Sequence, residues 1–414
     1  MAPVVLANGL PVIEIPMPNR PETAVAIAFP GGARYEAPDE VGVAHFLEHM
    51  VFKGTEMHRS ARDLNRSAER LGAELNGCTT DDCVEFNALA LAESAMPAID
   101  LVTDISGQAL LEEHHLETER TVILQELADE TEDPGTVADH RLIAGLFHGH
   151  RLAKPTAGEE SDVKRLTHAQ LLSFRDRQWS AAGGVFVVGG NLEDLDRGLM
   201  SELLVRIPAR PAPPPPPPIT PFVRRVEVEE RDGDVAHLRL AYALPDFDLG
   251  NARDRAAAEL FCDLLGGTAA SRLFDELREQ RGLCYEIDSY WWGYRGRVLL
   301  SVDCSLRPSS AAEAYGRIDA IIAELSAQGP TEEESLRARS YGMMASAIGL
   351  ESPAARVDRA VHLMLQCGDH EIDSTQHLRA LEAVTREDLA EFAERVAPGP
   401  CVGCVGPVPA STFE

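Results

Sequence analysis

The sequence predicts an α+β fold made of two homologous domains, each a mainly antiparallel sheet with helices packed on it. Three observations lead to this prediction. The chain has 414 residues, which suits two hydrophobic cores of roughly 200 residues each better than a single core. A proline-rich stretch divides it near the middle. The segments on either side follow the same order of strands and helices, as the two copies of a duplicated domain would.

The proline-rich stretch is residues 208–221, PARPAPPPPPPITP, with six consecutive prolines. Proline has no N–H and a fixed φ, so this stretch cannot continue a helix or a central strand and favours extended polyproline II. At about 3.1 Å per residue it could span roughly 40 Å. We therefore expect an N-terminal domain over residues 1–207, a linker over 208–221 and a C-terminal domain over 222–414.

The two halves begin alike. Each opens with an apolar strand, residues 24–29 in the first half and 236–244 in the second. A helix follows in each, around residues 41–53 and 255–267. A second amphipathic helix, an alternating strand region and another helix come next in both halves. The shared order favours duplication over chance similarity.

The halves also end alike. Residues 166–174, LTHAQLLSF, and 384–392, VTREDLAEF, both read as a capped helix start. A Gly-rich apolar strand follows each, GGVFVVGG in the first half and CVGCVG in the second. These matches complete the expectation of two copies of one plan.

Composition excludes some classes of function. The formal charge of −29, from 67 acidic and 38 basic residues, opposes phosphate binding, so we expect no nucleic-acid partner. The acidity either keeps the surface soluble or attracts basic peptides, and composition does not choose between these. No apolar run reaches the roughly 18 residues of a membrane span, and the N-terminus does not read as a secretory signal. We expect a cytoplasmic protein without a membrane partner.

The cysteine pattern indicates no disulfide framework. Eight cysteines in so long a chain are sparse, which fits a reducing compartment. The one CxxC, from Cys401 to Cys404, has no second pair, so we expect it to be structural or incidental rather than a metal or redox site.

The stretch VGVAHFLEHMVFKGT places His45, Glu48 and His49 together in an apolar run. In a helix over 41–53, the two histidines lie at i and i+4 on one face, near enough to ligate one ion. Neutral imidazoles suit Zn²⁺, and the order H-x-x-E-H is the inverzincin signature, in which the glutamate is the general base for water activated by the metal. The alternative is a solvated or core pair of histidines, and a third ligand is needed to decide.

A downstream helix offers candidates for that ligand. The segment HLETERTVILQELADETEDP is strongly periodic and carries Glu119 and Glu126 at i and i+7 on one face. Acidic residues on a helical face are usually only solvated, so periodicity alone does not assign either of them to a metal.

HFLEHMVFKGT, followed 77 residues after His49 by Glu126 in ERTVILQE, resembles the metallopeptidase family of pitrilysin, insulysin and the mitochondrial processing peptidases. The similarity extends over nearly the whole chain, and the two-domain length is similar to that of the processing-peptidase branch and its bacterial relatives. The resemblance implies one Zn²⁺ per chain, held by His45, His49 and Glu126. It also implies Glu48 as the general base and Glu119 as a carboxylate that supports the ligands.

The second half adds another match. GGTAASRLFDELREQRGLCYEI resembles the family segment that carries an arginine and a tyrosine seven residues apart, here Arg278 and Tyr285. The resemblance implies that they bind the substrate backbone or stabilise the developing oxyanion. No H-x-x-E-H occurs in this half, so one domain would perform the metal chemistry and the other would hold the substrate.

One segment departs from the family pattern. The family often has Asn-Ala-Tyr/Phe-Thr on a substrate-binding edge strand, whereas this chain has Asn76, Gly77, Cys78 and Thr79. Asn76 still fits a substrate-binding position, and an extended peptide could add to this strand. Gly77 and Cys78 change the side chains that a substrate would meet.

The resemblance implies a zinc-dependent endopeptidase that hydrolyses short or unstructured peptides inside an enclosed, clamshell-type chamber, with basic peptides as one expectation. We expect a homodimer; a monomer and a subunit of a heterodimeric processing peptidase are the alternatives. A non-catalytic scaffold of the same fold is a further alternative. The histidines at 148 and 150 are expected to be structural, and the sequence does not name the substrate.

Overall fold

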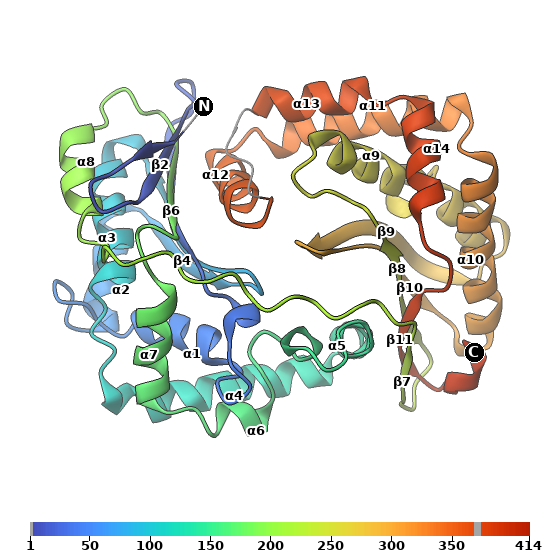
Figure 1. The fold of residues 1–414 in the computed structure, drawn as a ribbon, viewed down its shortest axis with the longest axis horizontal. Coiled ribbons are helices and arrows are strands. Elements are labelled where there is room, and N and C mark those ends of the chain that lie inside the picture. Colours follow the sequence, from blue (N-terminus) through green and yellow to red (C-terminus); the bar gives the residue numbers. More distant parts are fainter. Residues whose placement is uncertain (1–2, 368–373) are drawn as a thin grey trace. The chain divides into compact units, whose positions relative to one another are not determined.

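The computed structural model describes residues 3–367 and 374–414, which form two compact units (Figure 1). Each unit is built on one open, mainly antiparallel sheet with helices packed on it, so the predicted α+β fold class is confirmed. Among the described residues, no helix has the length and apolar content needed to cross a bilayer. Unit 1 comprises Met1–Leu127, Pro155–Pro217 and Gly349–Asp373, and unit 2 comprises Ala128–Lys154, Pro218–Ile348 and Ser374–Glu414.

The sheet of unit 1 has the strand order β1-β2-β6-β3-β5-β4. Only β2 and β6 pair in parallel; the other neighbours are antiparallel. Strand β4 therefore forms one edge of the sheet. The strands are β1 (Val4–Val5), β2 (Pro11–Pro16), β3 (Glu22–Pro30), β4 (Glu74–Thr79), β5 (Cys83–Leu91) and β6 (Val185–Gly190).

Helices cover both faces of this sheet. The larger core lies on one face, where α3 packs on β3 and β5 while α1 contacts β4 and α7. On the other face, α12 packs on β3 and β6 through Val357, Ala360 and Val361. The helices are α1 (Val43–Val51), α2 (Ala61–Leu71), α3 (Ala95–Gly107), α4 (Leu116–Glu132), α6 (Glu160–Val163), α7 (His168–Gln178), α8 (Arg197–Leu204) and α12 (Pro353–His362).

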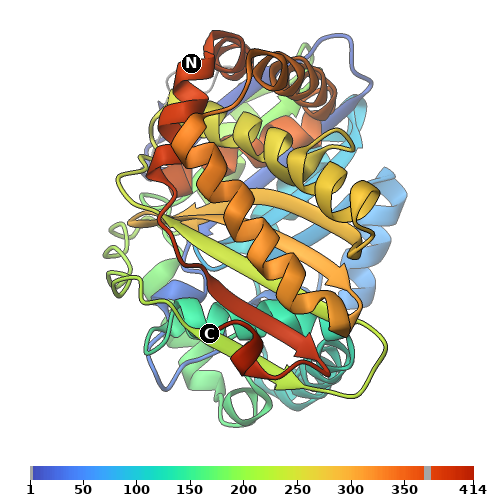
Figure 2. The same ribbon diagram turned by 90° about the vertical axis from the view of Figure 1, so that its right-hand side faces the viewer.

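The sheet of unit 2 has the order β7-β11-β8-β10-β9, with β9 at one edge. Figure 2 shows α9, α10 and α14 over one face of it, and α5 packs on β7, β8 and β11. The strands are β7 (Val226–Glu230), β8 (Ala236–Leu244), β9 (Cys284–Tyr294), β10 (Arg297–Leu306) and β11 (Cys401–Gly406). The helices are α5 (Pro134–Leu146), α9 (Ala252–Cys262), α10 (Ala311–Gln328), α11 (Glu332–Gly349), α13 (Ser374–Ala383) and α14 (Arg386–Arg395).

Five strands of each sheet share one topology, and β1 of unit 1 has no counterpart among the described strands of unit 2. Taken in chain order, β2 to β6 of unit 1 occupy the same places as β7 to β11 of unit 2, and the one parallel pair falls at the same place in both. The matching capped helices α7 and α14 both begin with a capping box, at Thr167 and Thr385. Each is followed by the Gly-rich strand that the sequence predicts.

Each half of the chain also supplies a helix to the other unit. Helix α5 of the first half packs on the sheet of unit 2, and α12 of the second half packs on the sheet of unit 1, against equivalent strands. No helix or strand occurs within 208–221. The compact units differ from the limits expected from the sequence, because α5 and α12 each pack on the sheet of the other half. The limits 1–207, 208–221 and 222–414 describe the two copies in chain order, and they stay a prediction.

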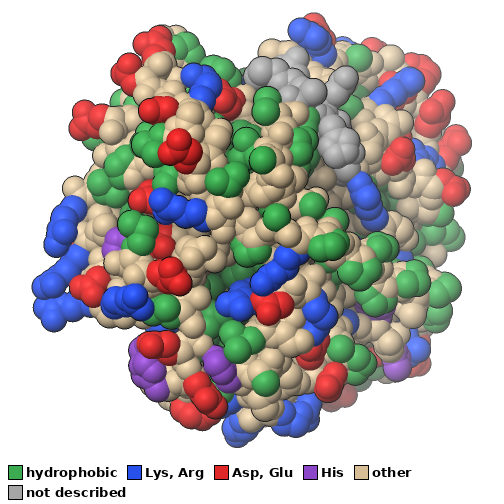
Figure 3. Space-filling view, turned by 60° about the vertical axis from the view of Figure 1, so that its left-hand side comes forward, with side chains coloured by type: hydrophobic (Ala, Val, Ile, Leu, Met, Phe, Trp, Pro, Cys, Tyr) green, Lys and Arg blue, Asp and Glu red, His purple; other side chains and the backbone are tan. Residues whose placement is uncertain are grey.

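Charged side chains of both signs are present on the surface. Figure 3 shows acidic and basic side chains interspersed over one face of the molecule. The net charge of −29 therefore does not by itself locate a surface that attracts cations.

Candidate metal and catalytic site

Helix α1 is fixed at its N-terminus by a glycine and a buried carboxylate. Gly42 precedes the helix with φ of 87°, a conformation that favours glycine, and an added Cβ would lie 2.4 Å from the carbonyl oxygen of Ala157. The carboxylate of Glu36 accepts hydrogen bonds from the backbone N–H groups of Gly42 and Ala44, each at 2.9 Å. An acidic group at this end satisfies unpaired N–H groups and complements the helix dipole.

The buried face of α1 leaves its histidines partly accessible. Phe46, Leu47 and Met50 are fully buried in the core of unit 1, which turns His45 and His49 to the remaining face. The imidazole rings of His45 and His49 are 4.7 Å apart between centroids, in an edge-on arrangement. The sequence-predicted pair therefore lies together, one turn apart on one helix.

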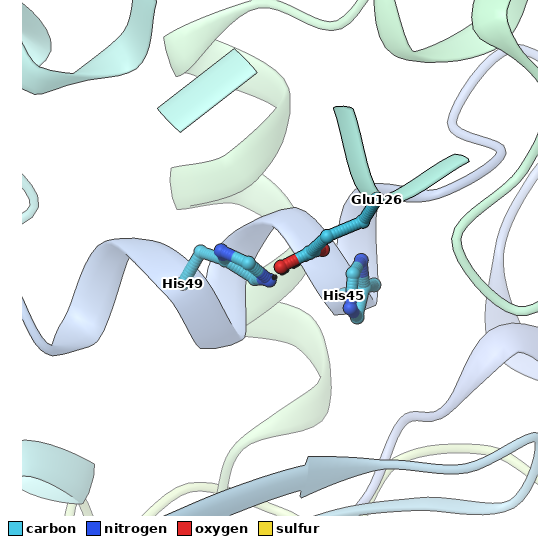
Figure 4. A group of neighbouring side chains, drawn as sticks. All are labelled: His45, His49 and Glu126. Carbon is cyan, nitrogen blue, oxygen red and sulfur yellow. Dashed lines mark ion pairs between the residues drawn. The ribbon is translucent and has the colours of Figure 1, made fainter. Parts of the chain in front are cut away.

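Glu126 of α4 completes a group of three possible ligands (Figure 4). One ligand atom from each of His45, His49 and Glu126 lies within 4.8 Å of the other two. The carboxylate oxygen of Glu126 is 3.4 Å from Nε2 of His49. Two imidazoles and a carboxylate form a donor set that suits Zn²⁺ with a coordination position left open.

A second carboxylate, that of Glu119, lies near the other ring nitrogen of His49. Glu119, 3% exposed, has an oxygen 3.7 Å from Nδ1 of His49. Its other oxygen accepts from the ammonium of Lys53 at 2.7 Å. A carboxylate hydrogen-bonded to the second nitrogen of a ligating imidazole fixes the ring orientation and tautomer. Glu119 lies on the correct side of His49 for this role, at a separation longer than a hydrogen bond.

The environment of His45 also fits a metal ligand. Burial, and secondarily the nearby His49, lowers the pKa of His45 to about 4. The ring is therefore neutral at neutral pH, the form in which imidazole ligates metals. Its Nδ1 is buried and has no hydrogen-bond partner among the residues that the structure describes. Nδ1 of His45 is therefore a buried polar atom that a bound ligand could satisfy.

Glu48 lies between this group and the edge strand β4. The hydroxyl of Thr79 donates to a carboxylate oxygen of Glu48 at 2.8 Å, which orients it. Burial is the largest influence on Glu48 and raises its pKa, while the Thr79 hydrogen bond and His49 act in the opposite direction. A carboxylate with a raised pKa next to possible metal ligands is suited to accept and return a proton.

Gly77 provides the space that Glu48 occupies. A Cβ at Gly77 would lie 3.0 Å from both Cγ and Oε1 of Glu48 and 2.9 Å from the ring of Phe52. A larger side chain at residue 77 would therefore push against the carboxylate.

Asn76 lies on the opposite face of β4. The burial of β4 alternates, with Glu74, Asn76 and Cys78 exposed and the intervening residues partly buried. Within the described residues, no strand pairs with the outer edge of β4, so its backbone groups are available for an added strand. The structure thus places Asn76 on a free edge strand, and its role in substrate binding stays a prediction.

Arg278 and Tyr285 lie together in unit 2. The guanidinium of Arg278 is 5.4 Å from the ring centroid of Tyr285 and 4.6 Å from that of Phe274. Tyr285 is 74% exposed at the start of the edge strand β9. The two predicted substrate-holding residues are therefore neighbours with accessible polar groups, and their action on a substrate stays a prediction.

A second group of possible ligands was not singled out from the sequence. Glu112, His114 and His115 also bring one ligand atom each within 4.8 Å of the others. Glu112 and His114 are exposed, and the two imidazoles are adjacent in the chain. Any measurement of bound metal must separate this surface group from the group on α1.

Three contacts near Glu48 and His49 were missed from the sequence. Thr79 and Gly77 of β4 contact Glu48 of α1. Lys53 pairs with Glu119 of α4. The available signal was periodicity, since Gly77 and Thr79 alternate on one face of a strand.

His150, Cys401 and Cys404, which are expected from the sequence to be structural or incidental, lie in surroundings that fit such roles. The ring of His150 accepts from the backbone N–H of Leu152, which fits the structural role expected for it. Cys401 and Cys404 are buried free thiols within β11. Burial raises the pKa of Cys404 to about 12, which suits an unreactive core thiol.

Comparison with known proteins decides the family. The family described as Insulinase (Peptidase family M16) matches residues 12–160, and Peptidase M16 inactive domain matches residues 165–341. An uncharacterized zinc protease of Mycobacterium bovis is 30% identical over 397 residues, covering 94% of this chain and 89% of that protein. The chain is a member of peptidase family M16. The resemblance inferred from its motifs is confirmed, including the two-domain bacterial branch.

Other relatives of this M16 chain carry similar names. An uncharacterized zinc protease of Streptomyces coelicolor is 28% identical, with 97% of this chain and 89% of that protein covered. The uncharacterized zinc protease YmxG of Bacillus subtilis is 26% identical, with 94% and 92% covered. The comparisons support a protease.

Solved structures of low sequence identity share the M16 fold. A peptidase M16 inactive domain from Pseudomonas fluorescens superposes with a TM-score of 0.88 at 20% identity, covering 98% of both chains. A protease from Helicobacter pylori has a TM-score of 0.84 at 19% identity, covering 98% of this chain and 100% of that one. A chain of complex III₂ from Candida albicans has a TM-score of 0.82 at 16% identity, covering 98% and 95%.

Proposed function

We propose that this M16 protein is a zinc-dependent endopeptidase that hydrolyses short or unstructured peptides. The observation that carries the proposal is the grouping on α1 and α4: three donor atoms lie within 4.8 Å of one another, and the partly buried carboxylate of Glu48 lies beside them. His45, His49 and Glu126 would hold one zinc ion per chain. Zinc bound there would supply Lewis acidity toward a peptide carbonyl and toward water.

The chain's own residues perform the rest of the reaction. An extended peptide adds to the free edge of β4, where main-chain hydrogen bonds hold it regardless of its sequence. Glu48, which touches Gly77 and is hydrogen-bonded by Thr79 of that same strand, then lies beside the bound backbone. Glu48 takes a proton from the attacking water and gives it to the leaving amine.

Arg278 and Tyr285 would hold the substrate. A guanidinium donates along a peptide backbone, and a phenol donates to a developing oxyanion. Their mutual contact and the exposure of Tyr285 support a shared role. We include in the proposal an enclosed chamber that admits unfolded peptides, and a homodimer as the working assembly.

Metal removal tests this function. The purified protein is expected to contain one zinc per chain and to lose peptide cleavage on treatment with a chelator, with recovery on adding zinc. His114→Ala serves as a matched control, since it removes a histidine from the exposed group of Glu112, His114 and His115 and should leave stoichiometry and cleavage unchanged. Full cleavage by metal-free protein would overturn the proposal.

The alternatives are a subunit of a heterodimeric peptidase and a non-catalytic scaffold. The scaffold is considered because a chain of complex III₂ shares this fold. A scaffold has no requirement for four residues of metal chemistry in register, and Arg278 and Tyr285 are present in the same chain. Size measurement of the purified chain discriminates: an active homodimer supports the proposal, whereas a zinc-loaded but inactive chain that gains activity only with another polypeptide supports the heterodimer.

A further inference from the structure

Two faces of the edge strand β4 offer different surroundings to a bound peptide. Gly77 and Thr79 point toward Glu48, as their contacts with it show. Cys78 points to the other face, and it is paired directly opposite Glu85 of β5. Since side chains alternate along an extended peptide, one set of substrate side chains would meet the face of Cys78 and Glu85.

Glu85 is a buried carboxylate that forms no ion pair with a cationic side chain in the part of the chain that the structure describes. Glu85 is 9% exposed. Among the described residues, its carboxylate accepts one hydrogen bond, from the side-chain amide of Asn87 at 2.9 Å. Within the described ranges, the charged side chain that acts on the pKa of Glu85 is Asp358 of α12, which is also acidic. Burial first, and Asp358 in addition, raises the pKa of Glu85, so ionised Glu85 lacks the compensation that buried charges usually have.

Cys78 leaves the path to Glu85 open. A peptide residue paired opposite Cys78 would share one row across the sheet with Cys78 and Glu85. Its Cα would be two strand spacings, roughly 9.6 Å, from that of Glu85. The four-carbon stem of lysine and the side chain of Glu85 can together bridge this separation above the small Cys78 side chain, whereas an aromatic residue at 78 would obstruct it.

We propose that Glu85 is a specificity-determining residue that selects a lysine or arginine side chain in the substrate residue paired opposite Cys78. The inference rests on the proposed peptidase function and on strand addition at β4. A preference for basic peptides would then come from one defined contact and not from the net charge of the protein. The interspersed acidic and basic side chains in Figure 3 agree with this. A charge-assisted hydrogen bond to Glu85 would hold the cationic head.

The test begins with mapped cut sites. Cleavage of a mixed library of unstructured peptides, followed by mass spectrometry, gives the residue preference at each position relative to the cut. We expect lysine and arginine to be enriched at one position. Matched peptides that carry lysine, norleucine or glutamate at that position then give kcat/KM, with lysine preferred over norleucine by about 10-fold or more, the effect of one charge-assisted hydrogen bond.

Variants separate Glu85 from its surroundings. Glu85→Gln should abolish the preference for lysine over norleucine while still cleaving the norleucine peptide, and Glu85→Lys should favour the glutamate peptide. Glu74→Gln is the matched control, because Glu74 is an exposed carboxylate on the same face of β4, opposite Leu89, and its loss should leave the preference unchanged. Cys78→Phe should reduce the preference without altering Glu85.

The outcomes distinguish this inference from the function beneath it. Equal cleavage of the lysine and norleucine peptides by the wild-type protein, or a preference retained in Glu85→Gln, overturns the role of Glu85 and leaves the peptidase standing. No cleavage of any peptide by zinc-loaded wild-type protein contradicts the peptidase itself, and the role of Glu85 fails with it.

Discussion

Units 1 and 2 share one strand order, yet only unit 1 carries the metal-binding pattern. Helix α1 follows β3 and presents His45 and His49 four residues apart. The helix that follows β8 is α9, which continues into a short π-helical segment, and it carries two acidic residues four apart, Glu259 and Asp263. Glu259 pairs with His377 at 3.1 Å and accepts a hydrogen bond from Ser346.

The helices that face these two pairs differ in the same way. Where α4 contributes Glu126 to unit 1, α11 brings Gly342 beside Asp263, whose Oδ2 would be 3.1 Å from a Cβ added at Gly342. One fold is therefore kept in both copies, while His45, His49 and Glu126, which could bind a metal, occur on α1 and α4 of unit 1.

The largest expected effect comes from removing a ligand in unit 1. His49→Ala should lose bound zinc and reduce peptide cleavage to the level of chelator-treated protein, because a catalytic zinc site has three protein ligands and this variant keeps two. Asp263→Asn, in the helical segment that follows β8 in unit 2, should keep one zinc per chain. Metal analysis of both variants checks this, and zinc retained by His49→Ala would contradict the assignment.

Substitutions in unit 2 should affect turnover without affecting zinc. Tyr285→Phe and Arg278→Ala are expected to lower kcat by about 10²- to 10³-fold, the usual effect of losing one donor to an oxyanion. Steady-state kinetics with metal analysis measures both quantities. Arg337→Ala is the control, because Arg337 is half exposed in a surface ion pair with Glu333. Unchanged kcat in both variants would remove unit 2 from the reaction.

A smaller effect is expected from substituting Glu119, the carboxylate near His49. Glu119→Gln should weaken zinc binding by about 10- to 100-fold, the range seen when a carboxylate that orients a ligating histidine is lost. Competition with a zinc chelator of known affinity gives the value. If Glu119 serves only to neutralise Lys53, its substitution would leave zinc affinity unchanged.

The smallest effect concerns the stability of unit 2. Burial, with help from Glu259 and Asp288, raises the pKa of Asp263 to about 7, against roughly 3.9 in an unfolded chain. The folded state therefore gains stability as pH falls from about 7 toward about 4, and above pH 7 it contains a poorly solvated charge. Asp263→Asn should raise Tm by a few degrees at pH 8 and by less at pH 5.

Thermal unfolding at the two pH values checks this, with Glu333→Gln as the control because the Glu333 side chain is 81% exposed. A shift in Tm of equal size at pH 8 and pH 5 would show that the carboxyl of Asp263 does not titrate as described.

Much of the fold could be predicted from the sequence because local signals carry it. Hydrophobic periodicity predicts α1 and α4, and a capped start predicts α7 and α14. The exchange of α5 and α12 could not be predicted in this way. An amphipathic helix shows that it has an apolar face but does not show which of two similar sheets that face will cover.

The candidate site divides along the same line. His45, Glu48 and His49 follow from helical spacing, since they lie on a single helix. Glu126 is 77 residues from His49 and was reached only by resemblance to a family. The hydrogen bond from Thr79 to Glu48 and the position of Glu85 opposite Cys78 were not predicted, because each is a contact between elements that periodicity does not specify.

The most direct test of the account compares wild-type protein with Glu48→Gln, both loaded with one zinc per chain, on a mixed library of unstructured peptides followed by mass spectrometry. The account predicts cleavage by the wild type and a loss of at least about 10²-fold in Glu48→Gln with zinc content unchanged, since a general base contributes about that much or more. Cleavage by Glu48→Gln at the wild-type rate, or no cleavage by zinc-loaded wild type, would contradict it.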